Sequence, residues 1–414
     1  MAALSVYLKE QRIGRLFENG DAFAFAFDQE MVDNLPGKIV LSVSMPVRGE
    51  PYFHEARTFF EGLLPEIGVR ETIARNLKLS PENTFGLLGA LGRDSAGAIV
   101  LLPDGDSLDR DASVEWLDDQ ELRKLIVALP RAPLGITGAS KVRLSLAGLQ
   151  RKAVLVRSGD GTFGLPNDGA PSTHLLKPQY EDTEYPNLVY NESFCMQVAE
   201  CVGLDVARSE IIFIDSIPCL LVERFDRSTD GAGLTRLHQE DLCQALGLPS
   251  GRKYQAEGGP STREASDLIR DVSHLGGADV LRFVRAVIVN YVLGNADAHA
   301  KNFALLYGES GLRLAPLYDI VSTAIYPEVD KTMAMSIGTE FDPDAVSLAA
   351  LEDFARDCGF SYRRLIEECR DTASKTLACA ESVVGLMKAE GLHVPQLDAI
   401  LELGRKRAVI LEAT

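Results

Sequence analysis

The sequence has few of the features that mark secreted, membrane-bound or metal-thiolate proteins. Its 414 residues include seven cysteines, none at Cys-x-x-Cys spacing, so we expect reduced, buried thiols of a cytosolic protein. The N-terminus lacks the basic head and apolar stretch of a signal peptide, and no uncharged apolar run approaches the ~18 residues that span a bilayer. Neither secretion nor membrane anchoring is therefore expected. The cysteines are Cys195, Cys201, Cys219, Cys243, Cys358, Cys369 and Cys379.

Positive charge is also scarce. Lys and Arg number 42 against 60 Asp and Glu, a net charge of -18, and such a surface repels a phosphate backbone unless a local basic patch intervenes. If the protein acts near DNA, we expect a basic partner to carry it there. Hydrophobic residues at 46% and charged residues at 25% are ordinary for a globular protein with a sizeable core, and the length suits a bilobed enzyme.

The N-terminal half reads as strand-rich. A period of two runs from Ser5 to Val47 and predicts a β meander that includes a strand over 38–47. Residues 53–91 have helical spacing, residues 96–103 return to strand, and the acidic stretch 104–119 reads as a connection. A mixed α+β fold is expected.

The remainder changes from strands to helices. Residues 135–226 are β-rich, with one helix-like run over 187–204. Beyond about residue 240 most of the chain is helical in pattern, and it ends in amphipathic segments such as 361–390. The organisation is a strand-rich N-terminal half and a helix-rich C-terminal half.

A polar stretch interrupts two apolar runs at "NYVLGNADAHAKNFALLY". Residues 279–293 predict a buried helix that stops at Gly294. After the polar residues, 302–319 reads as a hairpin whose second strand ends at Asp319. The order helix, polar loop, hairpin, aspartate predicts that Asp319 returns close to Asp297.

Asp297, Asn302 and Asp319 are the residue types that phosphoryl transfer requires. One carboxylate orients the attacking hydroxyl and accepts its proton, and further oxygen atoms hold magnesium against the nucleotide phosphates. A zinc site would call for more His or Cys. The alternative is that Asp297 and Asn302 only cap and turn a loop.

The chain then resembles a known family. "SLAGLQRKAVL", "HLLKPQ", "LLVERFDR", "RLHQEDLCQALGLP", "GNADAHAKNF" and "LYDIVST" occur in this order, with "FFEGLLPE" and "GALGRDSAGAI" before them. They are similar to motifs of the HipA family, the serine/threonine kinase toxins of bacterial type II toxin–antitoxin modules. The resemblance implies a bilobed protein-kinase-like fold related to the phosphoinositide-3/4-kinases. Its parts would be an extra N-terminal subdomain (1–105), a β-rich N-lobe (106–240) and an α-helical C-lobe (241–414).

The resemblance also implies roles for single residues. Asp297 would be the catalytic aspartate, Asn302 and Asp319 the magnesium ligands, and Lys177 the nucleotide lysine. The full set of implied ATP-binding residues is Ala147, Gly148, Lys177, Glu223, Phe225, His299, Lys301, Asn302 and Asp319. We expect His299 to orient the loop through hydrogen bonds rather than to act as the base.

From the residues alone, plainer interpretations stay open. Lys177 is also an ordinary strand-end lysine beside Pro178, and the segment around Glu223 and Phe225 is also a buried strand with an Arg-Asp pair at the surface. In "RLHQEDLCQ" we favour a helix-cap cluster, whose members would be His238, Glu240 and Asp241.

The glycine- and lysine-containing loop over 135–156 suits a lid over phosphates. In the HipA family, the serine at the position of Ser145 is autophosphorylated, which expels the loop from the nucleotide site. About two added negative charges beside a triphosphate would favour that ejection. The alternative is a surface serine without a role.

The implied cofactors are ATP and Mg²⁺, and the implied partner is a small helix-turn-helix, HipB-like antitoxin that would bring the protein to DNA only indirectly. The protein substrate would be an aminoacyl-tRNA synthetase, with glutamyl-tRNA synthetase as the family precedent. A small-molecule kinase, a non-catalytic co-repressor and a magnesium phosphohydrolase are the other hypotheses.

Overall fold

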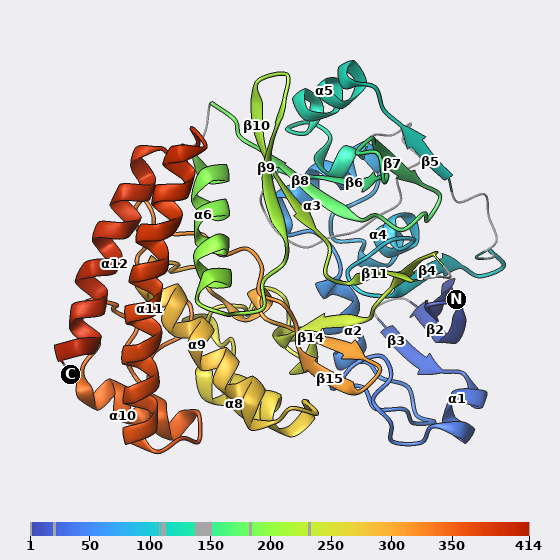
Figure 1. The fold of residues 1–414 in the computed structure, drawn as a ribbon. Coiled ribbons are helices and arrows are strands. Elements are labelled where there is room, and N and C mark those ends of the chain that lie inside the picture. The colour runs from blue at the N-terminus through green and yellow to red at the C-terminus, as the bar shows by residue number, and fades with distance from the viewer. Residues whose placement is uncertain are drawn as a thin grey trace. The chain divides into compact units, whose positions relative to one another are not determined.

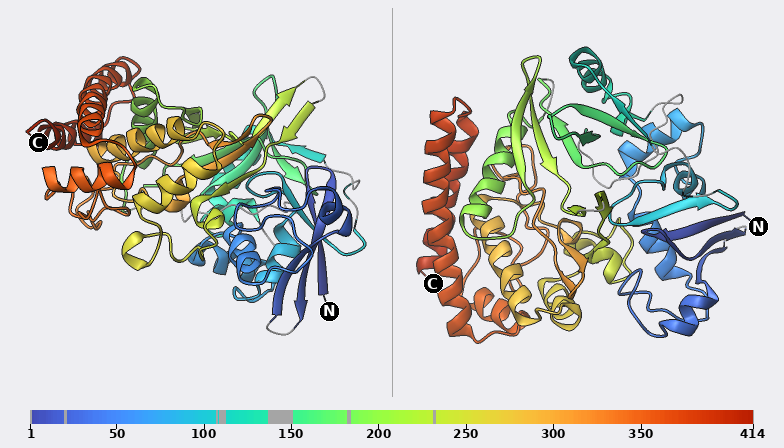
Figure 2. Two further views of the ribbon diagram at one scale, coloured as in Figure 1. Left: turned by 90° about the horizontal axis from the view of Figure 1, so that it is seen from below. Right: turned by 45° about the vertical axis from the view of Figure 1, so that its right-hand side comes forward.

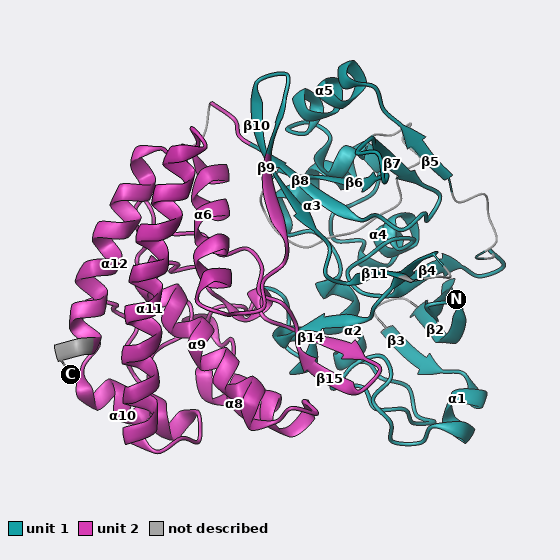
Figure 3. Ribbon diagram, viewed as in Figure 1, with its two compact units in different colours: residues 1–178, 212–251 teal, residues 179–211, 252–414 magenta. Residues whose placement is uncertain are grey.

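The structure is a computed structural model that describes residues 2–19, 22–106, 108, 113–136, 151–181, 184–230 and 233–413. The chain forms two compact units (Figure 3): residues 1–178 with 212–251, and residues 179–211 with 252–414. Each unit therefore uses two separate stretches of chain. Among the helices of the described ranges, none is long and apolar enough to cross a membrane.

The first unit begins with an antiparallel sheet in the order β3-β2-β1-β4 (Figure 1). The strands are β1 (Ala2–Leu8), β2 (Gln11–Asn19), β3 (Ala22–Phe27) and β4 (Ile99–Pro103). The predicted meander is confirmed for β1 to β3, and the strand predicted over 96–103 is confirmed by β4. The strand predicted over 38–47 is wrong: the N–H of Val47 donates to the carbonyl of Lys38 (2.9 Å), so the segment closes on itself. Its apolar residues Leu41, Met45 and Val47 are buried without strand pairing.

Four helices lie between β3 and β4. They are α1 (Gln29–Asn34), α2 (His54–Gly62), α3 (Ile67–Leu77) and α4 (Thr84–Leu91). Three of them, α2 to α4, agree with the helical spacing of residues 53–91, whereas α1 lies where the β meander was predicted. Phe59 and Phe60 of α2 are fully buried, and Phe60 packs against Phe25 of β3 with ring centroids 5.6 Å apart. The apolar face of the helix thus forms one core with the sheet.

A second sheet, in the order β5-β7-β6-β8-β10-β9, carries the rest of the first unit. Its strands are β5 (Ser113–Trp116), β6 (Ala153–Arg157), β7 (Phe163–Asn167), β8 (His174–Pro178), β9 (Ser209–Ile214) and β10 (Ile217–Glu223). Strand β5 lies within the stretch 104–119, for which a connection was expected. Helix α5 (Asp119–Ala128) follows it and starts with a capping box between Asp118 and Glu121.

Smaller elements complete the first unit. They are η1 (Pro133–Gly135), β11 (Arg227–Asp230), β12 (Gly233–Arg236), β13 (Gln239–Asp241) and α7 (Leu242–Ala245). Strands β11 and β12 form an antiparallel hairpin.

A buried ionic network joins two motifs of the first unit. Arg227 Nη2 lies 2.7 Å from Asp94 Oδ1, and Arg224 Nη2 lies 2.7 Å from Asp226 Oδ2. All four side chains are 2–3% exposed, so the interpretation of an Arg-Asp pair at the surface is wrong. The guanidinium groups fix the segment after β10 to the loop before β4.

The second unit is mainly helical, as predicted for the chain beyond residue 240 (Figure 2). Its helices are α6 (Leu188–Cys201), η2 (Gln255–Glu257), α8 (Thr262–Val272), α9 (Gly277–Leu293), η3 (Ala300–Asn302), α10 (Leu348–Asp357), α11 (Tyr362–Ala389) and α12 (Pro395–Ala413). Helix α11 packs against α6, α9, α10 and α12. The hairpin of β14 (Ala304–Gly308) and β15 (Gly311–Leu314) completes the unit.

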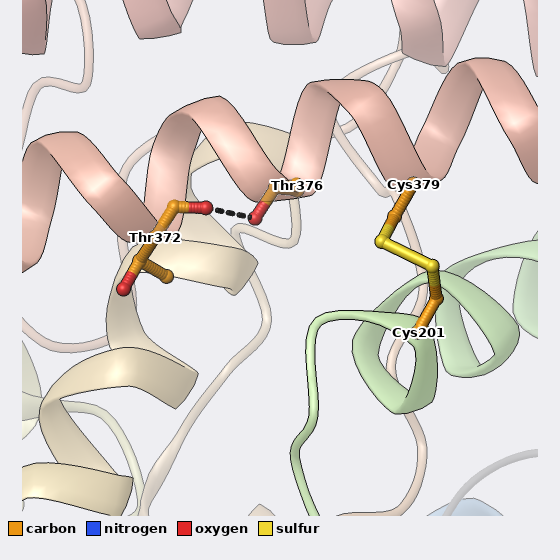
Figure 4. Close-up of a disulfide and its surroundings, with 4 residues drawn as sticks. All are labelled: Cys201, Thr372, Thr376 and Cys379. Atoms are coloured by element: carbon orange, nitrogen blue, oxygen red, sulfur yellow. Dashed lines mark hydrogen bonds between the residues drawn. A yellow bond between two sulfur atoms is a disulfide. The ribbon is translucent and has the colours of Figure 1, made fainter.

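A disulfide joins two of these helices (Figure 4). Cys201, at the end of α6, is bonded to Cys379 of α11 across 178 residues of sequence. The expectation that all cysteines are reduced is therefore wrong for this pair, which only the packing of α6 against α11 brings together. The other five cysteines are buried and are not disulfide-bonded, as expected.

Candidate active site

The polar loop follows the end of the buried helix α9. Gly294 adopts a left-handed conformation (φ 83°), and its N–H donates to the Asn290 carbonyl (3.0 Å). The side chain of Asn295 then links back to Asn290 Oδ1 (2.8 Å), and its own Oδ1 accepts from the Asp297 N–H (3.1 Å). The helix and its stop, both predicted from sequence, give Asp297 a rigid mount.

Asp297 is the half-exposed centre of the loop. Its Oδ1 accepts a hydrogen bond from the Tyr254 hydroxyl (2.6 Å). Its backbone carbonyl accepts from the Asn302 side-chain amide (3.0 Å) and from the His299 N–H (2.8 Å). Asp297 and Asn302, two of the residues singled out from sequence, are thus in direct contact. This contact uses the amide nitrogen of Asn302 and not its Oδ1.

His299 is buried beside Asp297. Its Nε2 lies 3.9 Å from Asp297 Oδ1, beyond hydrogen-bond distance, and within the described ranges its Nδ1 has no hydrogen-bond partner. Burial, with the nearby Lys253 ammonium, lowers the pKa of His299 to about 3. The imidazole is therefore neutral at physiological pH, and the hydrogen bond from His299 to Asp297 comes from its backbone N–H.

Asp319 follows the hairpin, as predicted, although β15 ends earlier than expected, at Leu314. Its backbone is left-handed (φ 58°), an uncommon conformation for a residue other than glycine. Burial and Lys253 lower the pKa of His299, and the negative charge of the Asp319 carboxylate partly opposes them. The Asp319 charge therefore lies within electrostatic reach of the loop. Next to it, the Tyr318 hydroxyl donates to the Lys301 carbonyl (2.6 Å).

The second unit therefore brings together Asp297, His299, Lys301, Asn302 and Asp319. Lys301 is buried and lies in the short helix η3 with Asn302. The oxygen atoms of Asn302 and Asp319 are the hard donors that Mg²⁺ prefers. In the described part of the chain, no group of three or more His, Cys, Asp and Glu residues could hold a metal ion. Mg²⁺ is commonly held by one or two protein oxygen donors together with water and substrate phosphates, and Asn302 and Asp319 fit that pattern.

Two of the remaining implied residues, Lys177 and Glu223, lie on the second sheet of the first unit. Lys177 is 5% exposed on β8 and pairs with Leu220 of β10. Glu223 ends β10, pairs with His174 and is exposed, while Phe225 follows it and is half-buried. Ser145, Ala147 and Gly148 lie outside the described residues.

The cap cluster predicted in "RLHQEDLCQ" is correct for one of its three members. Asp241 starts α7 with a capping box to Gln244. Glu240 is instead buried and accepts hydrogen bonds from Ser42 and Val43, and buried His238 contacts the Leu41 carbonyl through Nε2 (2.7 Å). These two side chains anchor the closed segment 38–47, which was not expected from sequence.

Sequence reasoning missed two residues that hold the site. Tyr254 contacts Asp297 from a distant stretch of sequence. The Asn191 side chain of α6 makes two hydrogen bonds of 2.9 Å to the backbone of Ser322, just beyond Asp319. Near Tyr254, the sequence "KYQAEGG" ends in two glycines, and this pair indicates a special backbone conformation after the tyrosine.

Known proteins are similar to this chain over nearly its whole length. The model of the HipA N-terminal domain matches residues 4–102, and that of the HipA-like C-terminal domain matches residues 144–380. Y4mE of Sinorhizobium fredii is 40% identical over 387 residues, 91% of each chain. The serine/threonine-protein kinase toxin HipA of Shewanella oneidensis is 30% identical over 411 residues, 95% of this chain and 90% of that protein.

One solved structure extends this similarity to the fold. It is the complex of HipA, HipB and operator DNA from the toxin–antitoxin system of Shewanella oneidensis. The match has a TM-score of 0.83 at 27% identity and covers 99% of this chain and 97% of that one.

Proposed function

Because the chain belongs to the HipA family and is a protein kinase, we propose that it is the cytoplasmic toxin of a type II toxin–antitoxin module. The observation that carries the proposal is the set of Asp297, Asn302 and Asp319, which one loop and one hairpin of the second unit bring together. Its fold would be the bilobed, phosphoinositide-3/4-kinase-related type.

We assign the chemistry as follows. Asp297 accepts the proton of the attacking serine or threonine hydroxyl, and its half-exposed carboxylate is accessible for that role. Asn302 and Asp319 would hold Mg²⁺, which supplies positive charge to the phosphates when bound. His299 and Lys301 would support the loop.

The nucleotide would also contact the first unit. Lys177 would neutralise the non-transferred phosphates of ATP, and the chain at Glu223 and Phe225 would offer backbone groups to adenine. Ala147 and Gly148 would belong to the phosphate lid, in which Ser145 would be the autophosphorylated residue that switches the kinase off.

A relative supports the proposed partner, and the family resemblance alone supports the proposed substrate. The Shewanella HipA is seen with HipB and operator DNA, and we propose a HipB-like helix-turn-helix antitoxin for this chain. Its net charge of -18 suits contact with DNA through a basic partner rather than directly. The proposed protein substrate is an aminoacyl-tRNA synthetase, such as glutamyl-tRNA synthetase.

One experiment tests the proposal. The wild-type chain and the Asp297→Ala variant are each expressed briefly, growth is followed, and phosphopeptides are compared. We expect growth arrest, a phosphorylated translation enzyme and phosphate on Ser145 with the wild type only. Equal growth arrest by both chains would refute a kinase toxin. Repression of transcription by the chain without any new phosphopeptide would favour the co-repressor.

A further inference from the structure

Tyr254 is held against Asp297 by more than one contact. Its hydroxyl donates to Asp297 Oδ1 over 2.6 Å, the length of a strong hydrogen bond to a charged acceptor. Its ring meets the buried His299 ring edge-to-face, with centroids 5.3 Å apart at 84°. The phenol is thus fixed both at its hydroxyl and along its edge.

The backbone ties the two segments together. The carbonyl of Ala334 accepts from the Gln255 N–H (2.9 Å), next to Tyr254, and the N–H of Ala334 donates to the Ala296 carbonyl (2.9 Å), next to Asp297. A single residue therefore sets the spacing of the phenol and the carboxylate.

A tight turn secures the Tyr254 side of this contact. The N–H of Gly259 donates to the Tyr254 carbonyl (2.8 Å). A Cβ atom at Gly259 would lie 2.7 Å from the carbonyl oxygens of Arg252 and Tyr254, so the turn requires glycine at this position. On the other side of the loop, the Ala300 N–H donates to the Lys253 carbonyl (3.3 Å).

We infer that Tyr254 is the positioning residue of the catalytic loop: its hydroxyl holds Asp297 Oδ1 and so fixes the carboxylate plane that faces the acceptor hydroxyl. The inference rests on the proposed role of Asp297. A free carboxylate rotates about its Cβ–Cγ bond, and one short hydrogen bond restricts that rotation before the substrate arrives. His299 does not replace this hydrogen bond, because its Nε2 is 3.9 Å away.

Tyr254→Phe tests the inference, and Tyr291→Phe is the matched control. Tyr291 lies on α9 of the same unit, and its buried hydroxyl donates to the Pro343 carbonyl (3.0 Å) instead of to a carboxylate of the loop. The full-length chain is given Mg²⁺ and γ-³²P-labelled ATP, and ADP formation and labelling of the chain are followed. Melting temperatures report the structural effect of each substitution.

We expect Tyr254→Phe to lower kcat on the order of tenfold to a hundredfold, as for loss of a hydrogen bond to a charged group. The KM for ATP stays within about twofold, because the hydroxyl acts on the acceptor side. Tyr291→Phe lowers the melting temperature and leaves kcat within about twofold. In the Asp297→Asn background, Tyr254→Phe causes no further loss, because the asparagine lacks the basic carboxylate through which the hydroxyl acts.

Other results overturn the inference. An unchanged or higher kcat in Tyr254→Phe, an equal loss in Tyr291→Phe, or additive losses in the double variant would each do so. If Asp297→Asn turns over ATP at the wild-type rate, or the wild type does not turn over ATP, the proposed function fails as well. An inactive Asp297→Asn beside a fully active Tyr254→Phe removes only the role of Tyr254.

Discussion

Removing one charge from the buried network of the first unit should weaken that unit strongly. Asp226 is 2% exposed and accepts hydrogen bonds from Arg224 Nη2 (2.7 Å), the Gly97 N–H (2.7 Å) and Gln239 Nε2 (2.9 Å). Asp226→Asn keeps the volume and removes the negative charge. Arg224 and Arg227 then share one buried counter-charge, and breaking such an arrangement costs about 3–5 kcal/mol.

The assay uses the single tryptophan of the chain, Trp116, which lies on β5 of the first unit. Its fluorescence in urea reports the unfolding of that unit separately from the second. With a urea slope of about 2–3 kcal/mol/M, the midpoint should fall by roughly 1–2 M. Asp215→Asn is the control, because the Arg123 and Asp215 side chains of the same unit are 59% and 57% exposed, and such pairs contribute about 0–1 kcal/mol.

The pH dependence gives a second readout of the same network. Burial alone would raise the pKa of Asp226, but Arg224 and Arg227 outweigh it and hold that pKa well below its usual range. A lowered carboxyl pKa adds stability that is fully present above the unfolded pKa of about 4 and is lost as the pH falls further. Asp226→Asn should flatten this acid loss. A midpoint that falls no further than that of Asp215→Asn would refute the reasoning.

Three further predictions concern other parts of the chain. Burial lowers the pKa of His238 to about 4, so NMR should show a neutral imidazole at pH 5.5. The stability of the folded chain that depends on this neutral ring is fully present above pH 6.5 and should decline as the pH falls toward 4. A protonation midpoint of the ring near pH 6.5 would contradict its burial. Replacing Cys201 and Cys379 with serine should lower the unfolding free energy by about 2–4 kcal/mol and abolish the response of stability to reductant, whereas an unchanged response would contradict the disulfide. Gly294→Ala should destabilise the second unit by more than about 1 kcal/mol, because φ is 83° and a Cβ would lie 2.5 Å from a leucine side chain, while Gly385→Ala, an exposed helical site with open space, should raise the melting temperature.

The candidate site could be predicted where its parts are close in sequence. Asp297 and Asn302 share a loop, and a hairpin of local hydrogen bonds brings back Asp319, so residue spacing sufficed for these three. The comparisons confirm the family resemblance and the protein-kinase activity. The roles of single residues, the three-part division of the chain and the Ser145 loop stay predictions.

What the sequence did not predict depends on packing between distant segments. Tyr254 contacts Asp297 directly, and the backbone of Ala334 holds their neighbours Gln255 and Ala296 together, which no local pattern encodes. The disulfide depends on α6 lying beside α11, and its cysteines have no informative spacing. Alternation over 38–47 was mistaken for a strand because burial produces the same apolar pattern whether or not a neighbouring strand pairs with it.

The interleaving of the two units has a consequence for synthesis at the ribosome. The first unit is complete only when residue 251 has emerged, whereas α6, made earlier, lacks its packing partners α9 and α11 until much later. Because domains fold as they emerge, the sheet with Lys177 can form before Asp297 has been translated. A product truncated between residues 251 and 297 would therefore retain all of the first unit and lack the aspartate of the polar loop.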